Sequence, residues 1–422
     1  MCRYIMRQVL IIINQIARKS NRLPKRWRSG SNRARLRNYN MKIAHTSDWH
    51  IGKKLMGRDR GEEFKRVLEE IGDICRREQV ELLLVAGDVF DTYTPSAEAE
   101  EIFYSSVRNI AKSCAVLIIS GNHDDYVRLT AAQSLSEELN IYTVGNNLKP
   151  LDCKKRGACY PVKSEGGYAI FENTAGERVY INMLPYPNEA RFKEGKSDES
   201  FAEKMARWIE YGERGREEGM PSVFLSHIFA AGGKASDSER EIDLGGARVV
   251  GLNLFPKCDY SALGHLHRRQ NLGNNIYYSG AIMRFTFDEA GQEKSVNVFD
   301  ITSDGVQNFK SVPLTSCARL VRLQANSVDG ALKLLKDNGD AIAELTLNLT
   351  EPLSPSEIST LHSCENLYSL HMAVDAQISA GEVARNAGKS SSQLFTEYYR
   401  QRFGAEAPAD LLELFLSLTE DE

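Results

Sequence analysis

The sequence predicts an α/β fold in which helices cover β-sheets, followed by a smaller α+β domain. Apolar runs of strand length alternate with amphipathic stretches of helix length over most of the chain, which is typical of sheets covered by helices. Some runs are continuous, as in ELLLVAG at 81–87, and such runs are typical of strands buried on both faces. Loops rich in His and Asp follow several strands, so we expect the functional groups at one edge of the fold.

The expected strands and helices follow in regular order from Met41. Helices are predicted where apolar residues recur at helical spacing, and Pro95 with Ser96 marks the start of the second one. The expected strands lie at 41–47, 81–87, 115–121, 222–227, 260–267 and 276–280, and the expected helices at 62–77, 96–111 and 128–139. Shorter strands are expected between 141 and 182. These segments together predict one large domain over residues 41–314.

The pattern changes near residue 315. Strand-like and helix-like segments alternate from RLVRL to LYSLHMA and predict a small α+β domain over residues 315–380. Residues 381–422 begin with a linker rich in Gly, Ser and Lys and end in two helices around Gly404 and Pro408. The apolar faces of these helices predict packing either on their own domain or on a partner protein.

The first forty residues differ in composition from the rest. Residues 1–40 contain eleven Lys and Arg and no Asp or Glu. We interpret them as a basic extension that is disordered or translated from an upstream start, with Met41 as the effective first residue. A basic nucleic-acid arm or a targeting segment is the alternative.

The overall composition excludes several classes of protein. From residue 41 onward the chain has 42 basic and 57 acidic side chains, a net charge of −15. This balance argues against strong long-range attraction to nucleic acid, so a polyanion must be held locally. No apolar run reaches the roughly 18 residues of a membrane span, so no membrane partner is expected. The eight cysteines form no CxxC pair, which predicts reduced thiols and a cytoplasmic chain.

Five loops carry residues suited to metal chemistry, and each follows an apolar strand. They read SDWH (47–50), GDVFD (87–91), GNHD (121–124), SH (226–227) and GHLH (264–267). Five of the eight histidines fall in these loops, and three of the loops also supply a carboxylate. Imidazole combined with carboxylate favours Mn, Fe or Zn over Mg or Ca. We therefore expect a metal site where these loops meet.

The order of the motifs is more informative than any one of them. A single DxH or GDxxD occurs by chance or as a turn, whereas GNHD combines a permissive Gly with three potential ligands or proton carriers. GHLH places two imidazoles on the same side of an extended chain. A pair of metal ions sharing a carboxylate, for which Asp88 is the natural choice, suits in-line displacement at phosphorus. His45, His362 and His371 match no motif and are predicted to be structural.

In this order the motifs resemble those of the calcineurin-like metallophosphoesterase superfamily. Longer segments, among them HTSDWHIGKKLMGRDRGEEF, LLVAGDVFDTYTPS and YSALGHLHRRQ, closely resemble the bacterial SbcD nuclease subunits, and the likeness extends over residues 41–310. The resemblance implies a β-sandwich flanked by helices, with a small α+β capping domain and C-terminal helices.

The resemblance also implies roles for the motif residues. One metal ion would be bound by Asp48, His50, Asp88 and His267, and the second by Asp88, Asn122, His227 and His265. His123 matches the family's catalytic histidine, which stabilises the pentacoordinate phosphate or protonates the leaving oxygen, and Asp124 is expected to orient it. Two Mn(II) ions are implied, with Mg(II) or another divalent ion as the alternative, and a water they activate is the nucleophile.

The activity and partners implied by the resemblance are those of a DNA end-processing enzyme. It would act as a 3′–5′ double-strand exonuclease and a single-strand or hairpin endonuclease in repair and recombination. An SbcC-type coiled-coil ATPase would dock on the helices at 391–418, and a second copy of the chain on helices 96–111 and 126–139, giving a homodimer within a heterotetramer. Candidates for phosphate contact are Lys53, Lys54, Arg58, Arg60, Arg268, Arg269 and Arg284.

Two other interpretations remain open at this level. The first is a phosphodiesterase or phosphatase for a small molecule, and the second is a metal-free scaffold. Thr92 follows GDVFD where protein phosphatases of the superfamily carry Arg, which argues against those enzymes. SDSERE after His227 and HRRQ after GHLH favour the nuclease. A scaffold is disfavoured because every position of the family pattern holds a competent residue.

Overall fold

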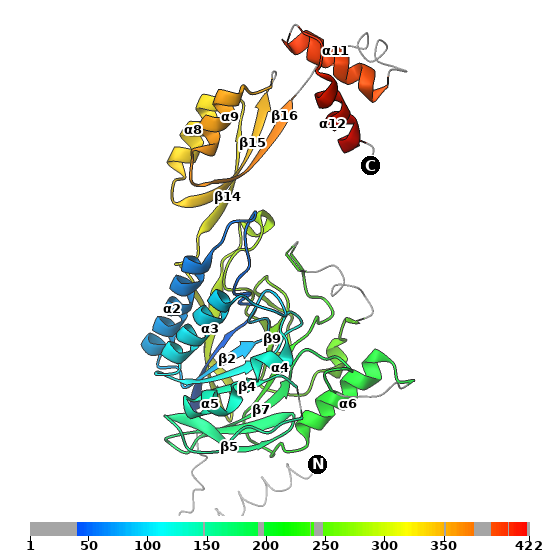
Figure 1. Cartoon of the computed structure of the whole chain (residues 1–422). Coiled ribbons are helices and arrows are strands. Elements are labelled where there is room, and N and C mark those ends of the chain that lie inside the picture. The colour runs from blue at the N-terminus through cyan, green and yellow to red at the C-terminus, as the bar shows by residue number, and fades with distance from the viewer. Residues whose placement is uncertain are drawn as a thin grey trace, which may run out of the picture. The chain divides into compact units, whose positions relative to one another are not determined.

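The computed structural model describes residues 40–146, 148–192, 198–236, 238–239, 248–349, 352–374, 390–403 and 405–419 (Figure 1). Apart from Asn40, the predicted basic extension lies outside the described residues. The chain divides into two compact units, and the division falls between Ala318 and Arg319.

The first unit contains a six-stranded sheet. Its strands are β1 (Asn40–Thr46), β2 (Leu82–Ala86), β3 (Ala115–Ile119), β4 (Ile141–Val144), β12 (Ser295–Thr302) and β13 (Gly305–Pro313). They lie in the order β13–β12–β1–β2–β3–β4. The pairs from β1 to β4 are parallel, and β12 pairs antiparallel with both β1 and β13. The three strands predicted up to residue 121 are confirmed, and the two C-terminal strands of this sheet were not foreseen.

The same unit contains a seven-stranded sheet. Its strands are β5 (Cys159–Glu165), β6 (Tyr168–Asn173), β7 (Arg178–Leu184), β8 (Ser222–His227), β9 (Tyr260–Gly264), β10 (Gln270–Asn271) and β11 (Ile276–Tyr278). The order is β10–β11–β9–β8–β7–β6–β5, with parallel pairing from β7 through β8 and β9 to β11. Pro161 lies in β5 at the sheet edge, where a residue without an N–H is tolerated.

The two sheets pack face to face and helices cover their outer faces. On β2, Leu82 and Leu84 join the core between the sheets, whereas Leu83 and Val85 join the core under α2 (Gly61–Glu78) and α3 (Ala97–Ile110). Helix α6 (Phe201–Glu213) covers the other sheet through a core that contains Trp208. Figure 1 shows α2 and α3 side by side over the first sheet. This arrangement confirms the predicted α/β sandwich flanked by helices.

One predicted helix is broken. The expectation of a single helix at 128–139 is wrong, because the structure has two short helices, α4 (Tyr126–Leu129) and α5 (Gln133–Glu138). The Asp125 carboxylate caps α4 by accepting the N–H groups of residues 127 and 128. Thr130 then donates its hydroxyl to the Tyr126 carbonyl at 2.9 Å, a side-chain bond that competes with helix continuation.

The second unit is a small parallel sheet with helices in its connections. Its elements are β14 (Arg319–Ala325), α8 (Val328–Asp337), β15 (Ala341–Leu349), α9 (Pro355–His362), β16 (Leu367–Val374), α11 (Ser391–Phe403) and α12 (Ala409–Thr419). Ser327 and Ser354 cap α8 and α9, and Pro355 stands at the first turn of α9. Within the described residues, no helix combines the length and apolar character needed to cross a membrane.

Candidate metal centre

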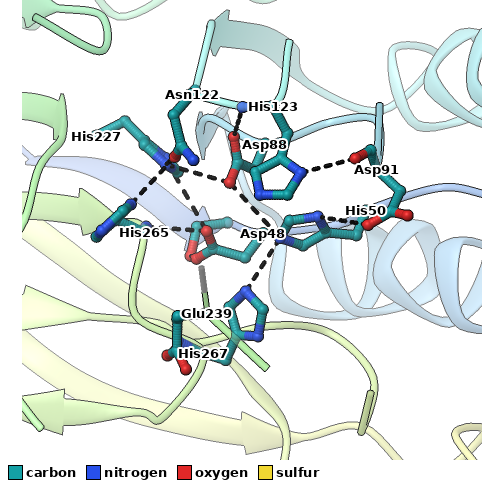
Figure 2. A network of polar contacts seen from close by, with 12 residues as sticks. Asp48, His50, Asp88, Asp91, Asn122, His123, His227, Glu239, His265 and His267 are labelled. Atoms are coloured by element: carbon teal, nitrogen blue, oxygen red, sulfur yellow. Dashed lines mark hydrogen bonds and ion pairs between the residues drawn. The ribbon is translucent and has the colours of Figure 1, made fainter. Parts of the chain in front are cut away.

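The carboxyl ends of five parallel strands bring the five motif loops to one rim. β1, β2 and β3 of the first sheet and β8 and β9 of the second end there, and each is followed by one of the motifs. The loops are tied together through the backbone, since Asp48 N–H donates to the Gly87 carbonyl at 3.0 Å and His50 N–H to the Asp88 carbonyl at 2.9 Å. Figure 2 shows the side chains pointing toward one another. All nine predicted site residues are buried.

Three of these side chains form what we name the His267 cluster: Asp48, His50 and His267. One ligand atom from each lies within 4.8 Å of the others. The Nε2 atoms of His50 and His267 are only 3.0 Å apart. Two ring nitrogens at this distance, beside a carboxylate, form a donor set suited to a divalent transition metal.

Four side chains form what we name the His227 cluster: Asp88, Asn122, His227 and His265. Asn122 Oδ1 lies 2.8 Å from His227 Nε2 and 3.1 Å from His265 Nδ1. Asp88 Oδ2 is 3.3 Å from His227 Nε2 and 3.5 Å from His50 Nε2, so it lies between the two clusters. Its second oxygen accepts the backbone N–H of His123 at 2.8 Å.

The backbone at the rim is held in an unusual conformation. Asp48, His50, Asp88 and His265 all have positive φ, at 52°, 46°, 51° and 104°. Such angles are uncommon for residues other than Gly and are retained where the surrounding structure enforces them, often at functional sites. A Cβ at Gly121 would collide with the Asp88 carboxylate, which explains the Gly of GNHD.

Comparison with known proteins identifies the family to which the chain belongs. A model of the calcineurin-like phosphoesterases matches residues 41–269. The SbcD subunit of the nuclease SbcCD from Bacillus subtilis is 34% identical over 399 residues, which cover 90% of this chain and 97% of that protein. The chain belongs to the SbcD nuclease subunits. It is therefore a metal-dependent phosphodiesterase of the calcineurin-like family.

Two further relatives carry the same name. The SbcD subunit from Staphylococcus epidermidis is 30% identical and covers 68% of this chain and 74% of that protein. The SbcD subunit from Rhodobacter capsulatus is 31% identical, with 68% of this chain and 72% of that protein covered.

The pKa shifts of the buried histidines in this SbcD-family site also fit the binding of a cation. Burial lowers the pKa of His50 and of His265 to about 3, so both imidazoles are neutral and suited to bind a metal. Burial also disfavours the charged form of His227, but Asp88 and Asp48 outweigh it and raise its pKa to about 9. In the described part of the chain, the buried Nε2 of His265 has no hydrogen-bond partner. The other ring nitrogen of His265, Nδ1, is the one that faces Asn122. A divalent cation held by these side chains would replace the proton on His227.

The surroundings of His123 differ from the expectation. Its Nδ1 lies 2.7 Å from the Asp91 carbonyl oxygen and donates to it. The Asp124 carboxylate instead accepts the backbone N–H groups of Gly121, Val89 and Phe90 at 2.8, 3.2 and 3.0 Å. In the described structure Asp124 therefore holds two motif loops together through their backbone, and it is the Asp91 carbonyl that contacts the His123 ring.

Residues outside the motifs complete the His267 cluster and were missed from the sequence. Ser238 Oγ lies 2.5 Å from His267 Nδ1 and donates to Glu289, while Glu239 accepts the backbone N–H of His267 at 2.7 Å. Lys294 Nζ pairs with Glu289 at 2.5 Å in a buried ion pair. In the sequence, Ser238 and Glu239 lie in the acidic segment SDSERE, and Glu289 lies in FTFDE. Neither segment indicates that its residues contact His267.

The predicted phosphate-binding cations divide into two groups. Arg60 is buried and pairs with Glu63 at 2.7 Å, and Arg284 donates to the carbonyls of Gln292 and Ala318. The expectation that Arg60 contacts phosphate is therefore wrong, whereas Arg284 is only partly buried and its contact with phosphate stays a prediction. Lys54, Arg58, Arg268 and Arg269 are exposed, and Lys53 is partly buried.

Proposed function

We propose that this chain is the nuclease subunit of a DNA end-processing complex, with Mn(II) as its metal. The observation that carries the proposal is the convergence of seven side chains of ligand type, with Asp88 between the two clusters. It would act as a 3′–5′ exonuclease on duplex ends and as an endonuclease on single strands and hairpins. The name shared by its relatives, which are subunits of the nuclease SbcCD, supports this function.

The two clusters would each hold one divalent ion. Asp48, His50 and His267 would bind the first, Asn122, His227 and His265 the second, and Asp88 would serve both. When bound, such a pair lowers the pKa of water and stabilises the charge that develops on the phosphate oxygens. His227 is ready for this role because its Nδ1 donates to the Ala86 carbonyl at 2.7 Å, which leaves Nε2 for the metal.

His123 would act on the departing oxygen. Its Nδ1–H is used by the Asp91 carbonyl, so Nε2 is the nitrogen that can accept a proton and deliver it. The backbone N–H of His123 is bound by Asp88, which fixes the ring relative to the metal-binding carboxylate. Protonating the leaving alkoxide from this position would contribute roughly 10²- to 10⁴-fold to the rate.

The charge distribution supports local binding of DNA. Lys54, Arg58, Arg268 and Arg269 flank the first and last motifs, whereas residues from 41 onward are acidic overall at −15. These cations would hold the sugar–phosphate backbone and would carry no sequence information. We therefore expect the chain alone to bind DNA weakly, with a DNA-binding ATPase supplying the remaining attraction.

Two surfaces of the described residues suit the partners of such a complex. Helices α11 and α12 leave Tyr398 and Leu414 more than half exposed, and we propose that an SbcC-type ATPase covers them. An apolar groove of about 500 Å³ lies between α3 and α5, and Leu135 at its border is 73% exposed. We propose that a second copy of the chain fills this groove, giving a homodimer within a heterotetramer.

The first test is Mn-dependent cleavage of linear duplex and hairpin DNA by the wild type, His123→Ala and Asp88→Ala, with and without the ATPase and ATP. Cleavage that requires Mn(II) and is lost in both variants is the expected result. A wild type that leaves DNA intact but hydrolyses bis-p-nitrophenyl phosphate would show that the substrate is a small molecule.

A further inference from the structure

A buried arginine outside all five motifs holds the GNHD loop from behind. Arg191 lies in the connection between β7 and α6, and only 4% of it is exposed. One terminal nitrogen donates to the Gly121 carbonyl at 2.7 Å, and the other donates to the Asp124 carbonyl at 2.9 Å. The single side chain therefore spans the loop on both sides of Asn122 and His123.

The guanidinium itself is fixed by its surroundings. Its Cζ lies 5.2 Å from the ring centre of Tyr186 and 5.6 Å from that of Tyr126, so aromatic rings contact the cation. Ser120 Oγ is a further acceptor at 3.3 Å. Because Arg presents N–H groups on two terminal nitrogens in a rigid plane, it can bridge two carbonyls at a set separation. A Lys ammonium would have to reach both carbonyls from a single nitrogen on a shorter side chain and without the planar geometry.

The loop that Arg191 holds carries two groups of the proposed active site. Asn122 contacts His227 and His265, and His123 reaches both Asp88 and the Asp91 carbonyl. The Asp124 carboxylate fixes the same loop through backbone N–H groups, so Arg191 supplies the complementary restraint on its carbonyls. A small displacement of this loop would move His123 relative to the substrate, and such misplacement is costly to the rate.

We propose that Arg191 is a positioning residue for His123. This inference rests on the proposed function, in which His123 protonates the leaving oxygen. If it holds, loss of the Arg191 bridge slows reactions that need this proton and spares those that do not.

The test compares two phosphodiesters at saturating Mn(II): bis-p-nitrophenyl phosphate, whose leaving group departs without a proton, and diphenyl phosphate, whose leaving group is more basic. Arg191→Lys should raise the ratio of their kcat values by about 10-fold, with His123→Ala raising it at least as much. In the His123→Ala background, Arg191→Lys should change the ratio no further, because both act through the same proton. Arg207→Lys is the matched control, since Arg207 is a surface residue that pairs with Glu199 at 2.9 Å.

Each outcome decides one claim. An unchanged ratio in Arg191→Lys, or an equal loss on both esters, overturns the inference. If Arg191→Lys melts below the assay temperature, Tyr126→Leu removes a ring that contacts the guanidinium and should shift the ratio in the same direction by about 3-fold; no shift overturns the inference. If His123→Ala leaves the ratio unchanged, the proposed role of His123 fails instead, and DNA cleavage by the wild type tests the substrate separately.

Discussion

The two ligand clusters are positioned by different kinds of contact. In the His267 cluster, the ring of His267 is oriented by the side chain of Ser238, behind which stand Glu289 and Lys294. In the His227 cluster, the ring of His227 is oriented by the Ala86 carbonyl of β2. One cluster thus depends on side chains brought from distant segments, and the other on the backbone of a central strand. Substitutions should therefore affect the two clusters separately.

The largest effect is expected at the residue common to both clusters. Asp88→Asn replaces the carboxylate between His50 and His227 by an amide, which is a poorer metal ligand. Substituting a residue that merely supports a metal ligand lowers metal affinity or activity by about 10- to 100-fold. Asp88 is itself a proposed ligand, so this substitution should lower activity by more than about 10³-fold. Calorimetry should show both Mn(II) sites weakened. A variant that keeps one site at its normal affinity would contradict the position of Asp88 between the clusters.

The backbone support of the His227 cluster can be broken at Gly87. Its φ is +85°, and a Cβ there would collide with the His227 ring. Gly87→Ala should lower the free energy of unfolding by more than about 3 kcal/mol, since backbone strain and steric conflict add. Gly176→Ala is the matched control, because Gly176 has a φ of +78° with open space around it. Gly176→Ala should lower the free energy of unfolding by only about 1–2 kcal/mol. If denaturant unfolding shows the same loss of stability in both variants, the steric conflict with His227 does not contribute.

The side-chain support of the His267 cluster can be weakened at Glu289. Although burial opposes ionisation, His267 and Lys294 lower the pKa of Glu289 to about 2, so this carboxylate is ionised at neutral pH. Glu289→Gln should weaken one of two Mn(II) sites about 10- to 100-fold and leave the other unchanged. Calorimetry on Glu293→Gln provides the control, because the Glu293 side chain is 56% exposed. A uniform loss at both sites would remove the distinction between the clusters.

The smallest effect is expected at a buried histidine outside both clusters. His45 contacts the Tyr260 hydroxyl at 3.0 Å and the Leu263 carbonyl at 3.2 Å, and burial lowers its pKa to about 3. In the unfolded chain His45 binds a proton as the pH falls below about 6.5, whereas in the folded chain it stays neutral down to about pH 3. The contribution of neutral His45 to the free energy of unfolding is therefore complete above pH 6.5 and is lost as the pH falls toward 3. At pH 5 the loss is about 2 kcal/mol.

The measurement is urea unfolding of the metal-free protein at pH 7 and pH 5. The wild type should lose about 2 kcal/mol more than His45→Gln over this interval. His371→Gln, which alters an exposed side chain, should follow the wild type. If His45→Gln loses as much stability as the wild type, His45 does not titrate as described.

Some residues of the site could be predicted from the sequence because they directly follow strands. Asp48, Asp88 and Asn122 each follow a recognisable apolar run, and parallel strands end at a common edge. Arg60 was misassigned because a basic residue after a motif looks the same whether it contacts phosphate or is buried against Glu63. Arg191 was missed because its 70-residue separation from Gly121 leaves no local signal.

The sequence by itself determined the fold class and the identity of the polar residues at the rim. Hydrophobic periodicity sets the strands, and strand polarity sets which loops meet, so local information was sufficient for both. Only the tertiary structure decided how these residues are supported. Asp124 binds the backbone of a neighbouring loop, Glu289 lies behind His267, and Arg191 spans the GNHD loop. The physical reason is that such contacts join distant segments, whose separation is set by sheet packing and not by the spacing of residues along the chain.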